Sequence, residues 1–401
     1  MTDGIDRRVA VDRLRSAVDA HPPDGDSVVV APEAVAGRTV AGDVTAPVSV
    51  PERPFATMDG FALVAGAEGP RPIVNSVAPA DDPDRLADGT AVRVATGAPL
   101  PDGADAVVPV EEATVRDGRL VAASPPPEPG ANLFPAGGTA AEGEVLFASG
   151  DGLSSRHAAL LCDLGIERVA VEPPRNTAVL ATGTEIARGV QPDRDSAMLA
   201  GLLRGWGCEP TTLPPVPDDR ERVAAAVAGA AAEYDLVITA GGTSVGPGDH
   251  VGDVLAEHDP LFDGIALRPG MPATAAVVDG TPVCALPGKP LAAHTVATLV
   301  LRPALAGTAD GRDPATVPAV AATDVDLPDE AVEYAIPVDL ADGRAVPVGQ
   351  GDGTAALYGD RFRPGRVASS TRATLADGVV LAEAPLVAGE DVRVVPYEVI
   401  E

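Results

Sequence analysis

Glycine and hydroxyl residues are concentrated in one segment, residues 241–249, which reads Gly-Gly-Thr-Ser-Val-Gly-Pro-Gly-Asp. It directly follows an apolar, β-branched run that ends at Ala240. A glycine-rich loop after a strand can bind an anion, because free backbone N–H groups and hydroxyls converge on phosphate oxygens. The spacing is neither that of a dinucleotide fingerprint nor that of a P-loop. The expected donors are three free N–H groups and two hydroxyls, from Gly241, Gly242, Gly246, Thr243 and Ser244.

Two more loops, Thr182–Glu185 and Pro287-Gly288-Lys289-Pro290, also follow predicted strands. The carboxyl ends of parallel strands meet at one edge of a sheet, so the three loops are expected to lie together. Glu185 and Asp249 could then hold a divalent ion that bridges ligand phosphates. Taken singly, the glycines could equally be turn formers and the carboxylates helix caps. Three such loops at one edge of the sheet favour a shared binding site. The predicted site residues from the third loop are Pro287, Gly288, Lys289 and Pro290.

Strand and helix patterns alternate through residues 176–305. The predicted strands are 177–181, 209–213, 234–240, 265–278 and 283–286, and the predicted helices are 195–205, 219–233, 250–258 and 290–305. Alternation of this kind is typical of a doubly wound parallel sheet with its ligand crevice at the carboxyl ends of the strands. The fold class is therefore multidomain, α/β plus β.

The flanking regions differ in pattern from this α/β segment. Helical spacing over residues 5–20 stops at Pro22-Pro23, and short β-like runs with Gly, Pro and Asp turns fill most of 53–130 and of the C-terminal region. Four domains are predicted: 1–52 together with 131–174, a helical linker domain; 53–130, a β-rich domain; 175–311, the α/β domain; and 312–401, a β-barrel.

The chain of 401 residues carries 59 acidic and 29 basic residues, a formal net charge of −30. This charge disfavours nucleic acid and anionic membranes as partners. Lys289 is the sole lysine, and the other 28 basic residues are Arg. An acidic, lysine-poor chain with 3% aromatic residues is typical of a protein that works in molar salt, where the Debye length falls to about 3 Å. We therefore hypothesise a salt-adapted source.

Three cysteines without C-x-x-C spacing, Cys162, Cys208 and Cys284, argue against a disulfide framework. The first residues lack an apolar signal region, and apolar runs stay shorter than the roughly 18 residues that a membrane span needs. A reducing, cytoplasmic location is expected.

Another segment with possible chemistry is Arg53–Ala62, which contains Met58-Asp59-Gly60, followed by Arg93–Pro99 with Thr96. With these segments the sequence resembles the MoeA family, the molybdopterin molybdotransferases, which includes the E domain of gephyrin. The matching segments occur in family order with family-like spacing: Thr57–Ala62, Val94–Val108, Thr182–Ile186, Gly241–Asp249, Arg268–Gly270 and Leu286–Pro290.

The resemblance implies an elongated, dimeric, four-domain protein whose central α/β domain is of the MoaB/Mog type. It implies that adenylylated molybdopterin and molybdate, or tungstate, are substrates and that AMP is released in the presence of Mg²⁺. A molybdopterin adenylyltransferase is a possible partner. The residues that match the family's polar positions are Asp59, Thr96, Glu185, Asp218, Asp249 and Arg268. Thr96 and Arg268 could donate to the oxyanion, while Gly241–Gly246 and Pro287–Pro290 would seat the pterin and its phosphate.

The sequence departs from the family at several positions. Met271 stands where a lysine is usual, and Lys289 stands where an asparagine is usual, so we hypothesise that Lys289 replaces the missing cation. An exposed turn lysine is the alternative. Asp218 is uncertain by one residue, because Asp219 beside it could be the functional carboxylate and either could cap the next helix. The last ninety residues match only loosely.

Two other functions stay open at the level of sequence. A non-catalytic, pterin-binding or scaffolding paralogue would explain Met271, Lys289 and the divergent C-terminal region. A molybdopterin adenylyltransferase shares the α/β domain, but the large β-rich unit and the C-terminal barrel argue against it.

Overall fold

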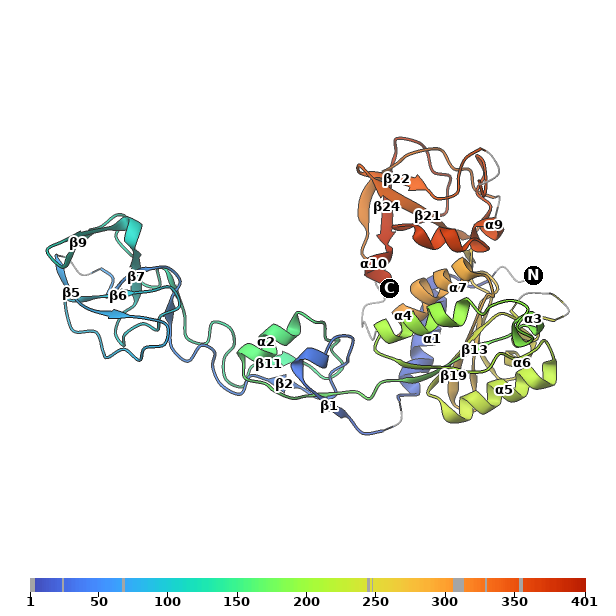
Figure 1. Cartoon of the computed structure of the whole chain (residues 1–401), viewed down its shortest axis with the longest axis horizontal. Coiled ribbons are helices and arrows are strands. Elements are labelled where there is room, and N and C mark those ends of the chain that lie inside the picture. Colours follow the sequence, from blue (N-terminus) through green and yellow to red (C-terminus); the bar gives the residue numbers. More distant parts are fainter. Residues whose placement is uncertain are drawn as a thin grey trace. The chain divides into compact units, whose positions relative to one another are not determined.

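The computed structural model describes residues 4–23, 25–66, 69–243, 246, 248–305, 314–328, 330–352 and 356–401. The chain forms two compact units, both drawn in Figure 1. The larger holds Met1–Val28, Ala36–Thr39 and Val171–Glu401, and the smaller holds Val29–Val35 and Val40–Ala170. The finer division into four domains stays a prediction.

A mixed sheet of strand order β14–β13–β15–β19–β18–β16 lies at the centre of the larger unit. Its parallel strands are β13 (Asn176–Ala181), β14 (Glu209–Thr212), β15 (Leu236–Ala240) and β19 (Thr281–Leu286). The antiparallel pairings are made by β18 (Thr274–Val278) with β19 and by β16 (Asp259–Asp263) with β18. The expected α/β sheet is confirmed, with an antiparallel side that the sequence analysis did not predict.

A tight turn explains the antiparallel side. Asp279 and Gly280 connect β18 to β19 and have φ values of 49° and 94°. Two consecutive left-handed residues favour a two-residue hairpin turn, so β18 folds straight back on β19.

Helices cover both faces of this sheet (Figure 1). One face carries α1 (Arg7–Ala20), α4 (Asp195–Gly205) and α7 (Pro290–Val296), and the other carries α5 (Arg220–Glu233) and α6 (Val251–Leu255). Strand side chains alternate between the two apolar cores: Val179 and Ile238 join the first, and Ala178 and Val237 join the second. After α7 the helix continues as a π-helical turn (Ala297–Leu301) and α8 (Arg302–Leu305).

The opening helix α1 belongs to the core of the larger unit. Asp6 caps it by accepting from the backbone N–H of Arg8 at 2.8 Å, and its buried face includes Ala10 and Leu14. This placement differs from the grouping of residues 1–52 with 131–174, because the apolar stripe of α1 is buried against the α/β sheet.

The C-terminal region forms the expected β-barrel. The ring runs β21 (Glu333–Ala341), β22 (Arg344–Pro347), β20 (Val317–Ala321), β24 (Asp391–Pro396) and β23 (Gly378–Ala382), and it closes because β23 also pairs with β21. A short strand from the α/β region, β17 (Leu267–Arg268), pairs with β21, so Arg268 lies opposite Tyr334. Two short helices, α9 (Pro364–Ala368) and α10 (Tyr397–Ile400), complete the region.

The smaller unit contains a six-stranded sheet, of order β7–β4–β6–β5–β9–β8. Its strands are β4 (Gly60–Leu63), β5 (Arg71–Val77), β6 (Ala91–Val94), β7 (Ala106–Pro109), β8 (Ala113–Arg116) and β9 (Arg119–Ala123). A Cβ at Gly60 would lie 2.2 Å from the carbonyl oxygen of Val108, so only glycine fits between β6 and β7.

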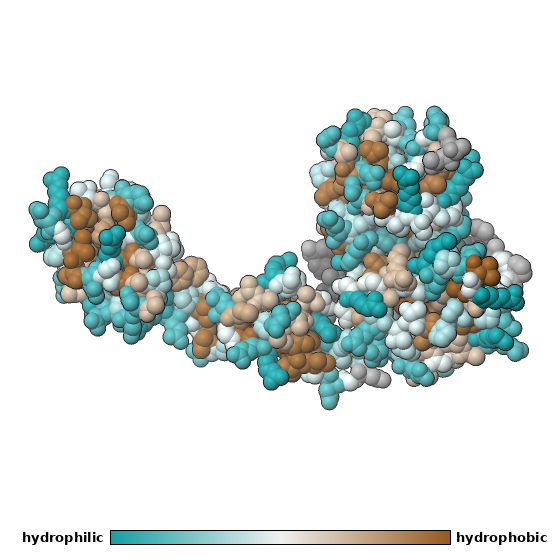
Figure 2. All heavy atoms as spheres, in the orientation of Figure 1, coloured by the Kyte–Doolittle hydropathy of each residue, from teal (hydrophilic) through white to brown (hydrophobic). Residues whose placement is uncertain are grey.

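Short elements make up the rest of the smaller unit and its ends. They are β1 (Val28–Val30), β2 (Val44–Thr45), β3 (Phe55–Ala56), β10 (Leu133–Phe134), β11 (Val145–Phe147), α2 (His157–Asp163) and β12 (Val169–Val171). On the face drawn in Figure 2, apolar residues form separate patches among hydrophilic ones. Among the residues that the structure describes, every helix is too short or too polar to cross a bilayer.

Candidate active site

Three loops meet at the carboxyl edge of the central sheet because the strands before them end in register. Ala181 of β13 pairs with Ala240 of β15, and Ala240 pairs with Leu286 of β19. The loops that start at Thr182, Gly241 and Pro287 are therefore neighbours, as the sequence predicted.

Glycine is required where these loops touch. Gly241 has φ of 100°, and a Cβ there would lie 2.7 Å from the carbonyl oxygen of Thr182. A Cβ at Gly288 would lie 2.9 Å from the Cα of Gly241. The three backbones approach one another too closely for a side chain at either position.

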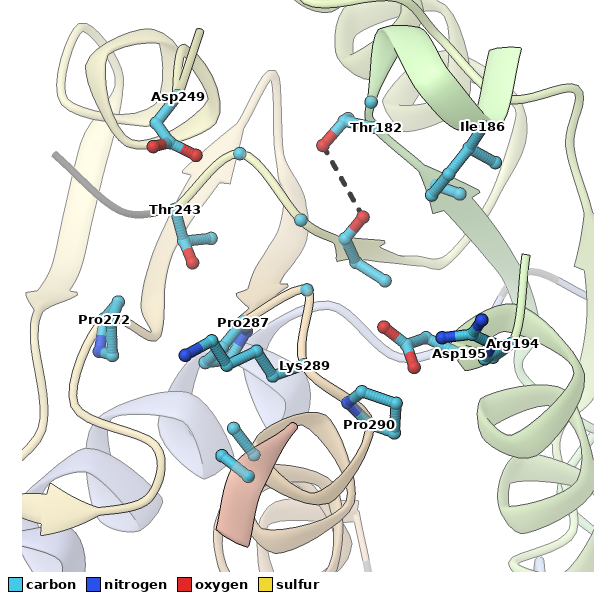
Figure 3. Close-up of a pocket in the computed structure, with 18 of the residues that line it drawn as sticks. Thr182, Ile186, Arg194, Asp195, Thr243, Asp249, Pro272, Pro287, Lys289 and Pro290 are labelled. Carbon is cyan, nitrogen blue, oxygen red and sulfur yellow. Dashed lines mark hydrogen bonds between the residues drawn. The ribbon is translucent and has the colours of Figure 1, made fainter. Parts of the chain in front are cut away.

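A cavity of about 620 Å³ opens over these loops (Figure 3). Its volume suits a ligand of the size of a nucleotide or a pterin. Most of the residues predicted for the site line it: Glu185, Asp218, Gly241, Gly242, Thr243, Gly246, Asp249, Arg268, Pro287, Gly288, Lys289 and Pro290. Ser244 lies outside the described residues, and Asp59 and Thr96 belong to the smaller unit.

Two of the N–H groups expected to be free are already bonded. The Gly241 N–H donates to the carbonyl oxygen of Leu286 at 3.0 Å, because it continues the ladder between β15 and β19. The Gly246 N–H donates to Oδ2 of Asp249 at 2.7 Å. The prediction that Gly241 and Gly246 offer free donors is therefore wrong, and Asp249 uses one oxygen to close its own loop.

The two adjacent aspartates have different hydrogen-bond partners. Asp219 is the N-cap of α5 and accepts from the Arg222 N–H at 3.0 Å. Asp218 instead lines the cavity, where Oδ2 accepts from the Thr184 N–H at 2.9 Å and its own N–H donates to Thr184 Oγ1 at 3.0 Å. This reciprocal pair anchors α3 (Thr184–Ala187), the short helix that carries Glu185.

The carboxylates fit a divalent ion only in part. Glu185, Asp218 and Asp249 all line the cavity, but no group of three His, Cys, Asp or Glu among the described residues is close enough to hold a metal ion. Magnesium is commonly held by one or two carboxylates together with substrate phosphates and water. This donor set therefore suits an ion that arrives with a phosphorylated ligand.

Two of the cations that line the cavity, Arg268 and Lys289, contact the C-terminal region. Arg268 Nε lies 2.6 Å from Oε2 of Glu330, and Arg268 Nη2 donates to the sulfur of Met271 at 3.2 Å. Lys289 Nζ donates to the carbonyl oxygen of Gly365 in α9 at 3.3 Å. An anionic ligand would therefore compete with Glu330 for Arg268 and with a neutral carbonyl for Lys289.

Two parts of the cavity wall were not predicted from the sequence. Gln191–Asp195, the segment leading into α4, forms one of them, and Pro364, Gly365 and Ala368 of α9 form the other. The only sequence signal for α9 was the small arginine cluster around it, Arg361, Arg363 and Arg366, which suits an exposed turn equally well.

Asp59 and Thr96 form a local pair in the smaller unit. Gly60 of β4 lies opposite Val94 of β6, which brings the residues just beyond each strand end together. Oδ1 of Asp59 accepts from the Thr96 N–H at 2.7 Å and from the Thr96 hydroxyl at 2.8 Å, and these two bonds hold the pKa of Asp59 below its usual value. The Thr96 hydroxyl would have to release Asp59 before it could donate to an oxyanion.

The carboxyl group of Asp195, at the start of α4, has a pKa above its usual value. Burial, followed by the nearby charge of Asp193, raises the pKa of this carboxyl from 3.8 to about 6. The folded chain therefore holds the proton more tightly than the unfolded chain, so folded-state stability is lost as pH rises from about 4 through about 6.

Replacing Asp195 by Asn should remove this loss. The Asp195→Asn variant is expected to unfold at a higher temperature than the wild type above pH 6, with the difference vanishing below pH 4. Calorimetry across this pH range checks it, and a difference that does not change with pH would contradict the assignment.

Comparison with known protein families identifies two regions of the chain. Residues 8–165 match the MoeA N-terminal region (domain I and II), and residues 178–307 match a probable molybdopterin binding domain. Molybdopterin molybdenumtransferase 2 of Mycobacterium tuberculosis (strain H37Rv) is 33% identical over 294 residues, covering 67% of this chain and 72% of that protein. The chain belongs to the MoeA family.

Further relatives of this MoeA-family chain agree. The molybdopterin molybdenumtransferase of Haemophilus influenzae is 31% identical over 284 residues, covering 68% of this chain and 70% of that protein. A crystal structure of a molybdopterin biosynthesis MoeA protein from Pyrococcus horikoshii is 26% identical, with a TM-score of 0.66 over 96% of this chain and 98% of that one. Another, 22% identical with a TM-score of 0.76 over 98% and 100% of the chains, shows the same fold.

Proposed function

We propose that this MoeA-family chain transfers molybdenum from molybdate to adenylylated molybdopterin and releases AMP. The observation that supports this most is the alignment of three strand ends, which gathers Glu185, Asp249 and Lys289 around one cavity. Cleavage of a phosphoanhydride needs positive charge near the phosphates, and carboxylates that recruit a divalent ion supply it.

Glu185 and Asp249 are proposed to hold Mg²⁺ together with the substrate phosphates. The ion would neutralise charge that develops on the phosphate oxygens. Asp218 would keep Glu185 in place through Thr184, and Gly242, Gly288 and Pro290 would seat the pterin phosphate. Arg268 would hold the oxyanion, molybdate or tungstate, once Glu330 leaves it.

The proposed reaction is tested by incubating purified protein with adenylylated molybdopterin and Mg²⁺, with and without molybdate. Molybdate-dependent appearance of AMP supports the transferase. Tight substrate binding without AMP release would instead support the scaffolding paralogue, which the pairing of Arg268 with Glu330 favours. Formation of adenylylated molybdopterin and pyrophosphate from ATP and molybdopterin would instead indicate an adenylyltransferase.

Lys289 is proposed to contact a ligand phosphate in place of the cation missing at Met271. Its amine gives up only a neutral carbonyl oxygen in doing so. Lys289→Ala is expected to weaken binding of adenylylated molybdopterin by about tenfold, or 1.4 kcal/mol. Calorimetric titration measures this, Lys289→Arg serves as the charge-preserving control, and an unchanged affinity in Lys289→Ala would reject the role.

Asp59 and Thr96 are proposed to complete the site from the partner subunit of a homodimer. Co-expression of Asp59→Asn and Glu185→Gln chains with different tags gives a heterodimer with one intact site if the residues act across subunits. About half of the wild-type activity is then expected. An inactive heterodimer would show that the residues act within one chain, or that the dimer does not form the site.

The net charge of −30 and the single lysine support a protein adapted to high salt. At molar salt, screening leaves only contact-range charges to act on an anionic substrate. Unfolding curves at low and molar salt test this, and full stability and activity in dilute buffer would contradict it.

A further inference from the structure

The wall of the cavity beside α7 is formed by the segment Gln191–Asp195. Asp195 begins α4, and Figure 3 shows its carboxylate turned into the pocket on the side of Pro290. None of the roles proposed above uses this carboxylate, although it lines the same cavity as Gly242 and Lys289.

The Asp195 carboxyl lacks a partner that it needs. Its Oδ1 atom is buried, and it has no hydrogen-bond partner among the described residues. Leaving such an atom unpaired costs about 1–3 kcal/mol. The neighbouring Asp193 is satisfied differently, because its Oδ1 accepts from the Ser196 N–H at 3.0 Å. Rotation about χ2 of an aspartate is broad, so either oxygen of Asp195 can face the cavity.

The missing partner must be a hydrogen-bond donor, and a ligand that fills the cavity can supply it, because Asp195 lines that cavity. A pair of parallel N–H donors satisfies both oxygens of one carboxylate, as a guanidinium does. The pyrimidinone ring of a pterin presents such a pair on one edge, its 2-amino group and its N3–H. The raised pKa of Asp195 reflects the same desolvation, which such donors would relieve.

We propose that Asp195 binds the 2-amino and N3–H edge of the pterin ring and so fixes the orientation of the substrate in the cavity. This inference rests on the proposed function and names the residue that selects the pterin. The glycine loops and Lys289 would bind the phosphate end of the substrate. Asp195 is thus a specificity-determining residue, distinct from the carboxylates that recruit the metal ion.

The affinities of the protein for two fluorescent ring compounds test the contact between Asp195 and this edge of the pterin. 6-Hydroxymethylpterin carries the 2-amino group, and 6-hydroxymethyllumazine carries an oxygen in its place. The wild-type protein is expected to bind the pterin about tenfold more tightly than the lumazine, a difference of 1.4 kcal/mol. In Asp195→Asn, which offers one acceptor and one donor, the ratio of the two dissociation constants should fall to near one.

Asp193→Asn is the matched control, because Asn keeps an acceptor for the Ser196 N–H and Asp195 retains its carboxylate. It should retain the tenfold preference. Equal binding of the two compounds by the wild type, no binding of either, or a preference that survives in Asp195→Asn would each overturn the inference.

Molybdate-dependent AMP release, measured on the same wild-type preparation, separates this inference from the proposed function. AMP release together with equal binding of pterin and lumazine would support the transferase function and exclude Asp195 as the residue that selects the pterin. A preference for pterin without AMP release would keep the Asp195 contact and remove the transferase.

Discussion

Glu185→Gln is expected to slow AMP release by about a hundredfold or more while leaving the fold intact. Gln keeps the size of the side chain but removes the charge that recruits a divalent ion. Glu185 lines the cavity on α3, a helix held in place by Asp218 and Thr184 rather than by Glu185 itself. The rate is measured as AMP formed per protein at saturating substrate.

Glu233→Gln is the control for this substitution. Glu233 is exposed at the end of α5 and is not among the residues lining the cavity, so its loss should leave the rate unchanged. Raising the Mg²⁺ concentration should partly restore the rate of AMP release in Glu185→Gln, because the remaining ligands still bind the ion weakly. A Glu185→Gln protein with wild-type turnover would exclude Glu185 as a metal ligand.

Gly241→Ala is expected to lower the free energy of unfolding by about 3 kcal/mol and to abolish substrate binding. Two penalties add at this position. An alanine at φ of 100° is strained, and its Cβ would lie 2.7 Å from the carbonyl oxygen of Thr182. The loops after β13 and β15 would have to separate, which disrupts the cavity that they form.

The Gly189→Ala variant distinguishes the cost of backbone strain from the cost of a steric clash. Gly189 also has positive φ, 68°, but a Cβ there meets nothing within 4 Å. The Gly189→Ala substitution is expected to lower the free energy of unfolding by about 1 kcal/mol and to leave substrate binding normal. Chemical unfolding of both variants gives the comparison, and equal losses would mean that the loop at Thr182 moves aside without cost.

Local sequence patterns were enough to predict the elements that carry the site. The helix predicted at 195–205 is α4, Asp195–Gly205, and the strand predicted at 177–181 is β13 within one residue. Glycines and hydroxyls after buried strands indicated the loops, since parallel strands align their carboxyl ends. The convergence of the three loops therefore followed from periodicity and turn chemistry alone.

The choice of ion-pair and hydrogen-bond partners could not be predicted in the same way. Arg268 pairs with Glu330, which lies far along the chain, and the Gly246 N–H pairs with Asp249 rather than remaining free for a ligand. Both choices depend on the final packing of the barrel and of the loop. β16 was missed because Pro260 and its aspartates lower the strand propensity of the segment, which only pairing with β18 overcomes.

We propose that the cavity over β13, β15 and β19 carries out metal transfer rather than storage of the pterin. One single-turnover experiment with adenylylated molybdopterin, Mg²⁺ and molybdate tests it, with AMP and pterin-bound molybdenum measured together. One AMP and one pterin-bound molybdenum are expected for each substrate molecule consumed. Retention of intact adenylylated molybdopterin on the protein, without AMP or bound metal, would contradict it.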